Sequence, residues 1–443
     1  MGCALTVPRT VILRRSPALA ARATTNPAQT RDAAAKGGCR DRSLRKRGGC
    51  GRLRAPIPET ASCRPGGSLS KKIFISVGEA SGDAHAAHLI DEIRKIEGDA
   101  EFLGLGGPKM TEAGCRCLTD VTAKSGMWVR HIVENYLHYR RIFHDAIRCF
   151  DEEKPDALVL IDHPVFNVPL ALRAKERGIP VIYYICPQTW AWGSWRIKRM
   201  ARRIDKMLVI LPFERAFWRK FGVDSEYVGH PVFDHLCSHP VPERKETGER
   251  LIGLLPGSRM TEIEKLFPLM LGAADILHGR FADARFKSIC TREEHVGPMQ
   301  EMAGDRDFVE IVAGDPHDLM KAATFCMVTS GTATLELAYF RTPMLVLYRV
   351  IWYGRPFVAV FASTDYISLP NLLAGKEIVP ELCLFSDNHR AVAAKTAEIL
   401  GDDSRRQACI GELDKLCAEI AKPGASARTA RAVLDYLNGR GGG

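Results

Sequence analysis

The sequence predicts an α/β protein built from two doubly wound parallel sheets in succession. Between residues 71 and 231, short apolar runs alternate with segments of helical periodicity. Runs of this kind between turn-forming residues are typical of strands buried on both faces of a parallel sheet. Residues 236–249 are polar and carry prolines, as linkers do, and the alternation begins again at residue 251. The pattern therefore predicts two Rossmann-like halves that face a cleft, followed by C-terminal helices.

The domain boundaries that we predict follow these changes of pattern. They are an extension at 1–70, a first Rossmann-like domain at 71–236, a second at 250–365, and a C-terminal loop with helices at 366–443. Residues 1–70 carry 14 Lys and Arg against 3 Asp and Glu, a net +11, whereas the other residues carry 48 against 49, a net −1. The basic balance thus belongs to the extension, and a nucleic-acid partner is not expected.

The composition of residues 1–70 fits a transit-like segment, a disordered extension or a start codon assigned too early, and these alternatives stay open. No apolar run reaches the roughly 18 residues that a membrane span needs. The 14 cysteines include no CxxC pair. Neither a zinc ribbon nor a disulfide framework is expected, and a reducing compartment is favoured.

The first strand, at residues 73–77, runs into the turn 78–83 and then a helix. A glycine-containing loop between a strand and a helix N-terminus can bind anions or sugar hydroxyls, which makes Ser81, Gly82 and Asp83 binding candidates. Ser81 or Asp83 could equally cap the helix. The loop lacks the GxGxxG spacing of a dinucleotide site.

An apolar and aromatic face lies near residues 127–137, with arginines and histidines beside it. Its members include Met127, Trp128, Val129, Ile132 and Val133. Such a face fits an interfacial helix that contacts acyl chains or a membrane, and it also fits a core helix with a solvated basic side.

The segment at residues 157–167, ALVLIDHPVFN, organises the first half. An apolar run at 157–161 ends at Asp162, and Pro164 stops the strand because proline offers no backbone donor. Asp162 therefore falls at the carboxyl end of a strand, where open α/β sheets bind ligands. The alternative is a cap on the next helix, which we expect at 170–177. Another strand, at 179–185, leads to Trp190, whose ring could stack on a base or a sugar or pack between elements.

In the second half, the strand at 251–255 leads to Arg259 at a strand-to-helix turn, which suits phosphate binding. The strand at 324–328 leads to Ser330, Gly331 and Thr332, whose small side chains let the backbone approach a diphosphate. Glu336 follows about one turn later and could accept hydrogen bonds from a ribose diol, or it is a first-turn acid. In the polar and aromatic loop at 364–376, Asn371 is the best binding candidate.

These features favour a nucleotide-sugar transferase without a bound metal or cofactor. No DxD-like pair or histidine cluster with ligand spacing is evident, so Arg259 would offset the charge of the leaving diphosphate.

Taken in order, nine motifs resemble the lipid-A-disaccharide synthase family, a group of family 19 glycosyltransferases of the GT-B type. They are GEASGD (78–83), GLGGPKM (104–110), IDHPVFN (161–167), PQTWAW (187–192), LPFE (211–214), VGHP (228–231), LLPGSR (254–259), TSGTATLE (329–336) and TDYISLPNLLAGK (364–376). The resemblance covers residues 71–440.

The resemblance implies an inverting transfer of 2,3-diacylglucosamine from UDP to 2,3-diacylglucosamine 1-phosphate, which yields a β-1,6-linked disaccharide and UDP. It implies that Asp162 is the general base on the acceptor 6-hydroxyl, that Arg259 contacts the diphosphate and that Glu336 contacts the ribose. It assigns the phosphates to residues 330–332 and the acceptor to the first domain. It also implies that the apolar patch near 127–137 meets a membrane.

Three departures from the family pattern stand out. Many members read IDAPDFN, whereas here His163 and Val165 replace the alanine and the second acid. The apolar patch is bulkier than usual and contains Arg130 and His131, and the extension at 1–70 has no family counterpart.

The expected location is cytoplasmic, peripheral on the inner face of the inner membrane, or an organelle if residues 1–70 are a transit peptide. A homodimer stays open. The alternatives to the synthase are another UDP-sugar transferase or epimerase of this fold and a lipid-binding surface protein that has lost catalysis.

Overall fold

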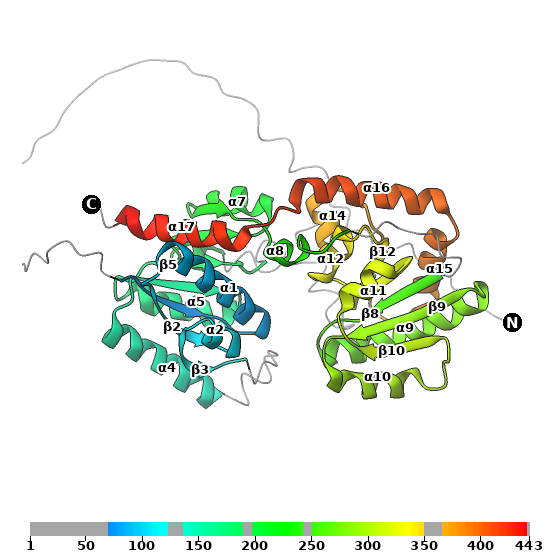
Figure 1. The fold of residues 1–443 in the computed structure, drawn as a ribbon, viewed down its shortest axis with the longest axis horizontal. Coiled ribbons are helices and arrows are strands. Elements are labelled where there is room, and N and C mark those ends of the chain that lie inside the picture. The colour runs from blue at the N-terminus through cyan, green and yellow to red at the C-terminus, as the bar shows by residue number, and fades with distance from the viewer. Residues whose placement is uncertain (1–69, 123–135, 189–196, 242–249, 350–365, 441–443) are drawn as a thin grey trace, which may run out of the picture. The chain divides into compact units, whose positions relative to one another are not determined.

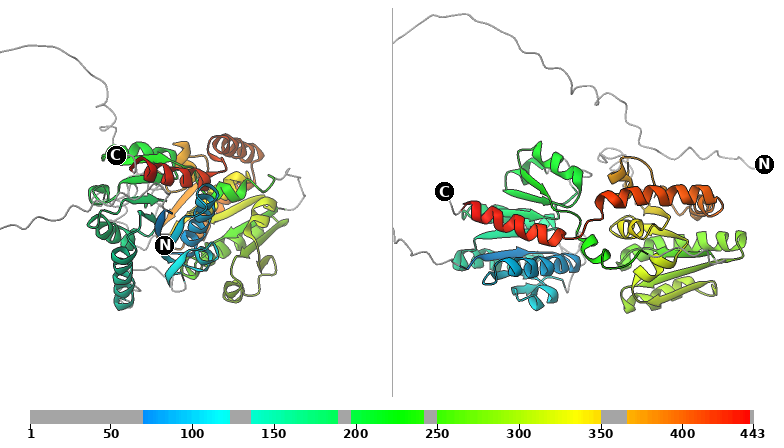
Figure 2. Two further views of the ribbon diagram at one scale, coloured as in Figure 1. Left: turned by 60° about the vertical axis from the view of Figure 1, so that its left-hand side comes forward. Right: turned by 45° about the horizontal axis from the view of Figure 1, so that its top comes forward.

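The computed structural model describes residues 70–122, 136–188, 197–241, 250–349 and 366–440. Over these ranges the chain forms two parallel sheets with helices around them, so the predicted α/β class is confirmed (Figures 1 and 2). Within the same ranges, no helix has the length and apolar character needed to cross a membrane.

The first sheet has the strand order β3-β2-β1-β4-β5-β6-β7, and every neighbouring pair is parallel. Its strands are β1 (Lys72–Ser76), β2 (Glu101–Gly106), β3 (Arg116–Asp120), β4 (Ala157–Ile161), β5 (Val181–Tyr184), β6 (Lys206–Val209) and β7 (Asp224–Tyr227). The helices of this half are α1 (Ala80–Ile96), α2 (Pro108–Glu112), α4 (Tyr136–Glu153), α5 (Pro164–Lys175), α6 (Ile197–Ala201), α7 (Pro212–Arg219) and α8 (Val232–Leu236).

The second sheet has the order β10-β9-β8-β11-β12-β13 and is also parallel throughout. Its strands are β8 (Arg250–Leu255), β9 (Ala284–Cys290), β10 (Val309–Ala313), β11 (Phe325–Thr329), β12 (Met344–Arg349) and β13 (Glu381–Leu384). The helices that follow in the chain are α9 (Met260–Arg280), the 3-10 turn η2 (Glu293–His295), α10 (Val296–Ala303), α11 (Pro316–Ala322), α12 (Ala333–Tyr339), α14 (Leu369–Ala374), α15 (His389–Leu400), α16 (Asp403–Ile420) and α17 (Ala425–Arg440).

Each sheet contains a point at which the direction of winding reverses. The chain begins at a central strand, winds to one edge, and returns to the other side of that first strand. As a result β1 lies beside β4, and β8 lies beside β11. Such a reversal opens a crevice at the carboxyl ends of the two strands, where α/β proteins bind their ligands. The loops after these four strands position the candidate site.

The strand β4 shows why the central strands read as unbroken apolar runs. Leu158 and Leu160 pack into one hydrophobic cluster with α4 and α5, whereas Val159 and Ile161 pack into another with α1. Successive side chains point to opposite faces of a strand, and both faces are covered by helices. All of β4 is consequently buried, as its sequence predicted.

The structure differs from the sequence-based expectation in two places. The helix after Asp162 begins at Pro164 rather than at residue 170, because proline is well placed in a first helical turn, where no backbone donor is required. No bounds were predicted from the sequence for the inner strands β9 and β12 or for the edge strands β3, β7, β10 and β13. The edge strands are only partly buried and lack a continuous apolar run.

The last helix returns to the first sheet. Ala430, Val433 and Leu434 of α17 belong to the same hydrophobic cluster as β1 and α1, and α17 lies beside α1 in Figure 1. The carboxylate of Asp234, on α8, accepts hydrogen bonds from the amides of Ala425 and Ser426 at 2.8 Å each, which caps α17. The C-terminal segment therefore completes the core of the first half.

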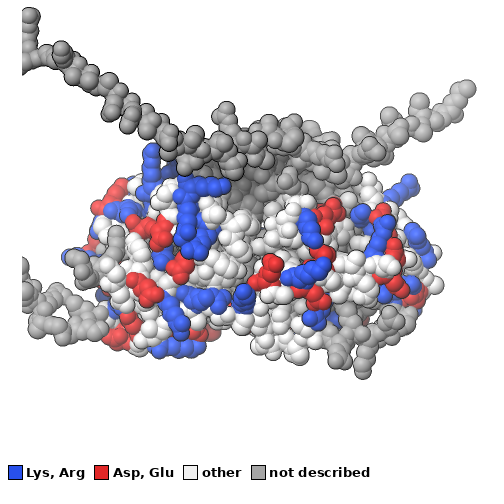
Figure 3. All heavy atoms as spheres, turned by 90° about the horizontal axis from the view of Figure 1, so that it is seen from above, with Lys and Arg blue, Asp and Glu red and all other residues white. Residues whose placement is uncertain are grey.

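Charges are mixed on the surface. Lys and Arg side chains alternate with Asp and Glu over the coloured part of the face seen in Figure 3. This agrees with the near-zero net charge of the chain beyond residue 70.

Candidate active site

Asp162 follows β4 at the switch point of the first sheet, and its backbone is in a strained conformation. Asp162 and His163 have φ angles of 50° and 47°, in the left-handed region that non-glycine residues rarely adopt. Such a residue costs roughly 1–3 kcal/mol and persists only where its surroundings hold it in place. Two consecutive strained residues at the end of a central strand make this loop a candidate functional site.

Asn167, on α5, holds this strand end. Its side chain is fully buried, and its amide donates to the carbonyl oxygens of Ile161 at 3.1 Å and Asp162 at 2.8 Å. Its own carbonyl oxygen accepts from the hydroxyl of Ser76 at 2.8 Å, and the hydroxyl of Tyr183 donates to the Asp162 carbonyl. The backbone of Asp162 is thus fixed by buried side chains of β1, β5 and α5.

His163 fills the space between the two central loops of the first half. It is 5% exposed, and its ring lies parallel to that of Phe166 with centroids 5.9 Å apart. A Cβ added to Gly78 would lie 2.3 Å from the ring, so only glycine permits this approach. Burial lowers the pKa of His163 to about 4, and the histidine is therefore neutral near pH 7.

The electrostatic surroundings of Asp162 favour a basic carboxylate. Burial raises the pKa of Asp162, the backbone amide of His163 opposes this rise, and the negative charge of Glu79 adds to it. The positive charge of Arg259 lowers the pKa of Asp162. A carboxylate whose pKa is raised binds a proton more readily, as a general base must.

Arg259 reaches from the second half to the first. Its guanidinium donates to Glu79 at 2.6 Å and to Glu262, on its own helix, at 3.0 Å. Arg259 stands between β8 and α9, at the switch point of the second sheet, and is 56% exposed. The structure therefore brings Arg259 to the loop between β1 and α1, whose neighbouring strand carries Asp162.

The residues after β11 form the other side of the second switch point. Gly331 has open space where a Cβ would stand, Thr332 immediately precedes α12, and the hydroxyl of Ser330 donates to the carbonyl of Ile367 at 3.2 Å. Glu336 lies in the first turn of α12, 3.6 Å from Nε2 of His317. These residues follow β11 and Arg259 follows β8, and the two strands are neighbours in the second sheet.

A cluster of histidine rings beside Glu336 was not predicted. The centroid of His317 lies 5.7 Å from that of His235 and 5.8 Å from that of His239. The carboxylate of Glu336 raises the pKa of His317, and Asp315 adds to the effect. His235 and His239 are four residues apart, whereas His317 lies 78 residues after His239, so the fold brings His317 to the other two.

Two predicted binding residues use their polar groups inside the protein. The fully buried Asn371 accepts from the amides of Ile378 and Val379 at 2.7 and 3.0 Å and donates to Val379 and Glu381 at 2.8 and 2.6 Å. This set leaves its amide group little capacity for a ligand.

Asp83 is 2% exposed and accepts from the amides of Gly107, Lys109 and Met110 at 2.7–3.1 Å. It therefore caps the turn into α2. Next to it, Ser81 is exposed and Gly82 packs against Val77.

Several predicted residues lie outside the described ranges. They are Trp190 and the acyl-contact candidates Met127, Trp128, Val129, Ile132 and Val133. Just after this segment, the first turn of α4 carries Leu137, which is 76% exposed.

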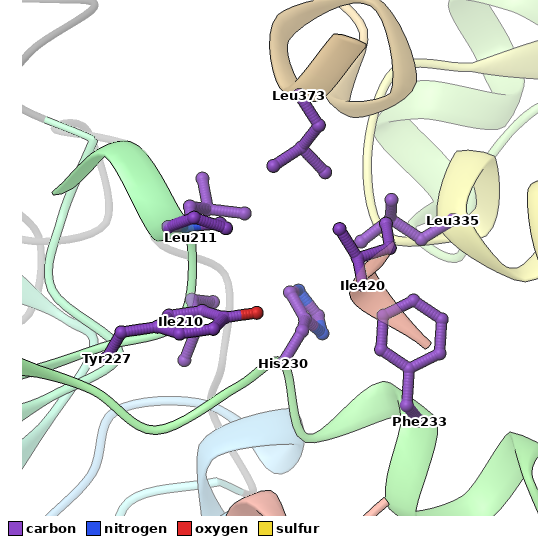
Figure 4. Close-up of a pocket in the computed structure, with 9 residues that line it drawn as sticks. Ile210, Leu211, Tyr227, His230, Phe233, Leu335, Leu373 and Ile420 are labelled. Carbon is purple, nitrogen blue, oxygen red and sulfur yellow. The ribbon is translucent and has the colours of Figure 1, made fainter. Parts of the chain in front are cut away.

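The seam between the halves is apolar beside Glu336. Leu335 shares a small pocket with Leu211, Tyr227, His230 and Phe233, and with other apolar side chains from both halves (Figure 4). Burial lowers the pKa of His230 to about 3, and its ring nitrogen accepts from the amide of Val232 at 3.2 Å. Among the described residues, no group of three or more His, Cys, Asp or Glu could hold a metal ion.

Comparisons with known proteins agree on one family. The model of a family described as lipid-A-disaccharide synthetase matches residues 73–432. The lipid-A-disaccharide synthase of Syntrophus aciditrophicus is 37% identical over 378 residues, which are 83% of this chain and 98% of that protein. That of Geobacter sulfurreducens is 35% identical over 391 residues, 84% of this chain and 98% of the relative.

Solved structures support the fold alone. The UDP co-structure of MnaA from S. aureus has a TM-score of 0.59 at 15% identity and covers 83% of this chain and 97% of its own. The glycosyltransferase of kitacinnamycin has a TM-score of 0.57 at 15% identity, with 83% and 99% covered. The fold is therefore shared by a glycosyltransferase and a protein solved with UDP.

Proposed function

The chain belongs to the lipid-A-disaccharide synthase family, and from this premise we propose the reaction and the residues that perform it. The enzyme transfers 2,3-diacylglucosamine from UDP to the 6-hydroxyl of 2,3-diacylglucosamine 1-phosphate. The products are the β-1,6-linked disaccharide 1-phosphate and UDP. The observation that carries the assignment is Asp162, an acid held in a strained backbone at the switch point of the first sheet.

Asp162 acts as the general base. Its carboxylate takes the proton of the acceptor 6-hydroxyl while that oxygen forms the new bond to C1 of the donor sugar. The bond between C1 and the diphosphate breaks on the opposite face, and the diphosphate leaves with the electron pair. The hydrogen bonds from Asn167 and Tyr183 to the Asp162 carbonyl hold the base in place for this step.

Residues of the second half bind the donor. Arg259 pairs with the diphosphate, on which negative charge grows as C1–O cleavage proceeds. The backbone at Ser330, Gly331 and Thr332 approaches the phosphates, and Glu336 accepts hydrogen bonds from the ribose hydroxyls.

The acyl chains of both substrates require an apolar environment. We assign this contact, and a peripheral association with the cytoplasmic face of a membrane, to the apolar patch near 127–137. The test is sedimentation with phospholipid vesicles. The full chain should sediment at high salt and be released by detergent, whereas a W128S/I132S double variant should stay in the supernatant.

The experiment that tests the reaction is product detection by mass spectrometry. The full chain receives UDP-2,3-diacylglucosamine and 2,3-diacylglucosamine 1-phosphate, and disaccharide 1-phosphate with UDP is the expected product. Asp162→Asn should lower kcat by roughly 100-fold or more, the scale of a lost general base, and leave UDP affinity unchanged. Asp305→Asn, on an exposed loop of the second half, is the control. Near-normal turnover by a folded Asp162→Asn variant would contradict the assignment.

A further inference from the structure

Glu79 is a charged residue that the sequence analysis did not select. It follows Gly78 after β1 and stands at the N-terminal boundary of α1, where the helix dipole favours an acid. Its side chain makes no capping hydrogen bond. The carboxylate instead accepts from Arg259, 180 residues away in the other half, at 2.6 Å. Glu79 is thus used for a contact between the two halves rather than for its own helix.

The ion pair with Glu79 engages the guanidinium of Arg259, to which the donor diphosphate would also bind. Arg259 has two carboxylate partners, Glu79 from the first half and Glu262 from the second. A diphosphate that pairs with Arg259 must compete with both of them. Guanidinium binds phosphate and carboxylate groups through the same fork of N–H donors, so one can replace the other.

The same two charges lie near the candidate base, because Gly78 lies against the ring of His163 and the loop that carries Glu79 thus adjoins the loop that carries Asp162. Glu79 raises the pKa of Asp162 and Arg259 lowers it, so their effects oppose each other while the ion pair is intact. The other titratable groups around Asp162 are His163, Tyr183 and Cys186. A diphosphate that draws Arg259 away leaves the negative charge of Glu79 beside Asp162 with less compensation.

We propose that Glu79 is a positioning residue that couples donor binding to the base: it holds Arg259 until a donor diphosphate takes the guanidinium, and its freed carboxylate then acts on Asp162. The inference rests on the proposed function, because it needs a diphosphate-bearing donor and a basic Asp162. The proposal gives Glu79 a role in the loop after β1. Through this side chain, binding of the donor diphosphate to Arg259 affects the base that acts on the acceptor.

Three variants separate the two effects of Glu79. Glu79→Gln removes both the hold on Arg259 and the negative charge. Glu79→Asp keeps the charge, but it is one methylene shorter and loses the 2.6 Å contact. Glu262→Gln is the matched control, since it frees Arg259 from its other partner without altering Glu79.

Calorimetric titration of the full chain with UDP measures the first effect. All three variants should bind UDP about two- to five-fold more tightly, the scale of releasing one partly exposed ion pair. Glu79→Gln should also show a lower KM for the donor together with a lower kcat. Unchanged or weaker UDP binding by folded Glu79→Gln and Glu79→Asp would overturn the proposal that Glu79 restrains Arg259.

The pH profile of kcat/KM measures the second effect. The acid limb of Glu79→Gln should move to lower pH by about half a unit or more, as expected for the loss of one charge near the base. The limbs of Glu79→Asp and Glu262→Gln should stay in place. An unmoved limb in Glu79→Gln would overturn the coupling to Asp162. A chain that binds UDP but makes no disaccharide would instead refute the proposed function, and the UDP titrations would still decide whether Glu79 restrains Arg259.

Discussion

At the switch point of the first sheet, the left-handed backbone angles fall on Asp162 and His163, whereas at that of the second sheet the positive φ falls on Gly257. Glycine adopts such angles at little cost, but an aspartate and a histidine do not. The first site is therefore held by buried side chains such as Asn167, and the second needs no such support. We expect the first site to be sensitive to its packing and the second to its charge.

The largest effect should come from the charge of the second site. Arg259→Ala should lower kcat/KM by roughly 10²–10³, because a donor to the developing charge on the leaving group is lost. It should also weaken UDP binding, which Asp162→Asn should not. Arg259→Lys should be intermediate, since ammonium keeps the charge but lacks the planar fork. Calorimetry and steady-state kinetics measure both quantities.

Arg292→Ala serves as the control for this prediction, because Arg292 is an exposed arginine of the second half paired with Glu294. It should leave both UDP affinity and turnover unchanged. Unaltered UDP affinity in Arg259→Ala would show that Arg259 does not bind the diphosphate. The expectation that the second site depends on its charge would then be wrong.

A matched pair of buried asparagines sharpens the comparison. Asn167 and Asn371 are both fully buried and fully hydrogen-bonded, one behind each site. Replacing either by alanine should cost roughly 1–3 kcal/mol in the free energy of unfolding, because buried polar groups lose their partners. Urea denaturation measures this cost. Only Asn167→Ala should also lower kcat, since its loss frees the strained carbonyl of Asp162.

The kinetic assays must be run where both asparagine variants are fully folded. Loss of UDP affinity in folded Asn371→Ala would restore Asn371 as a nucleotide contact, as its sequence context predicted. Normal kcat in Asn167→Ala would mean that Asp162 keeps its position without this support.

In the first half, the sequence predicted the central strands better than the edge strands. The apolar run at 157–161 coincides with β4, because a strand buried on both faces leaves a continuous hydrophobic signal. Edge strands such as β3 leave none, since their residues are partly exposed. The return of α17 to the first sheet depends on packing between distant segments, which local periodicity does not record.

The candidate site shows the same division. Asp162, Arg259 and residues 330–332 were selected because they follow apolar strands, and the structure places these strands at the two switch points. Glu79 was not selected, because its contact with Arg259 joins residues 180 positions apart, which local sequence does not record. Asp83 and Asn371 were chosen for residue type and loop position, but the structure uses their polar atoms to hold loops. Residue type alone does not distinguish a ligand contact from an internal one.

The smallest effect that we expect concerns His317 and Glu336 in the second site. Glu336 raises the pKa of His317, so this pair contributes stability below the unfolded pKa of about 6.5 and loses it as pH rises through the higher folded value. His317→Gln should therefore lower the free energy of unfolding by roughly 1 kcal/mol at pH 5.5 and by less at pH 9. Urea denaturation of His317→Gln, Glu336→Gln and the double variant at both pH values gives the coupling energy. A coupling energy that does not change with pH would show that the contact is not an ion pair, and the charge of the second site would then rest on Arg259 without help from His317.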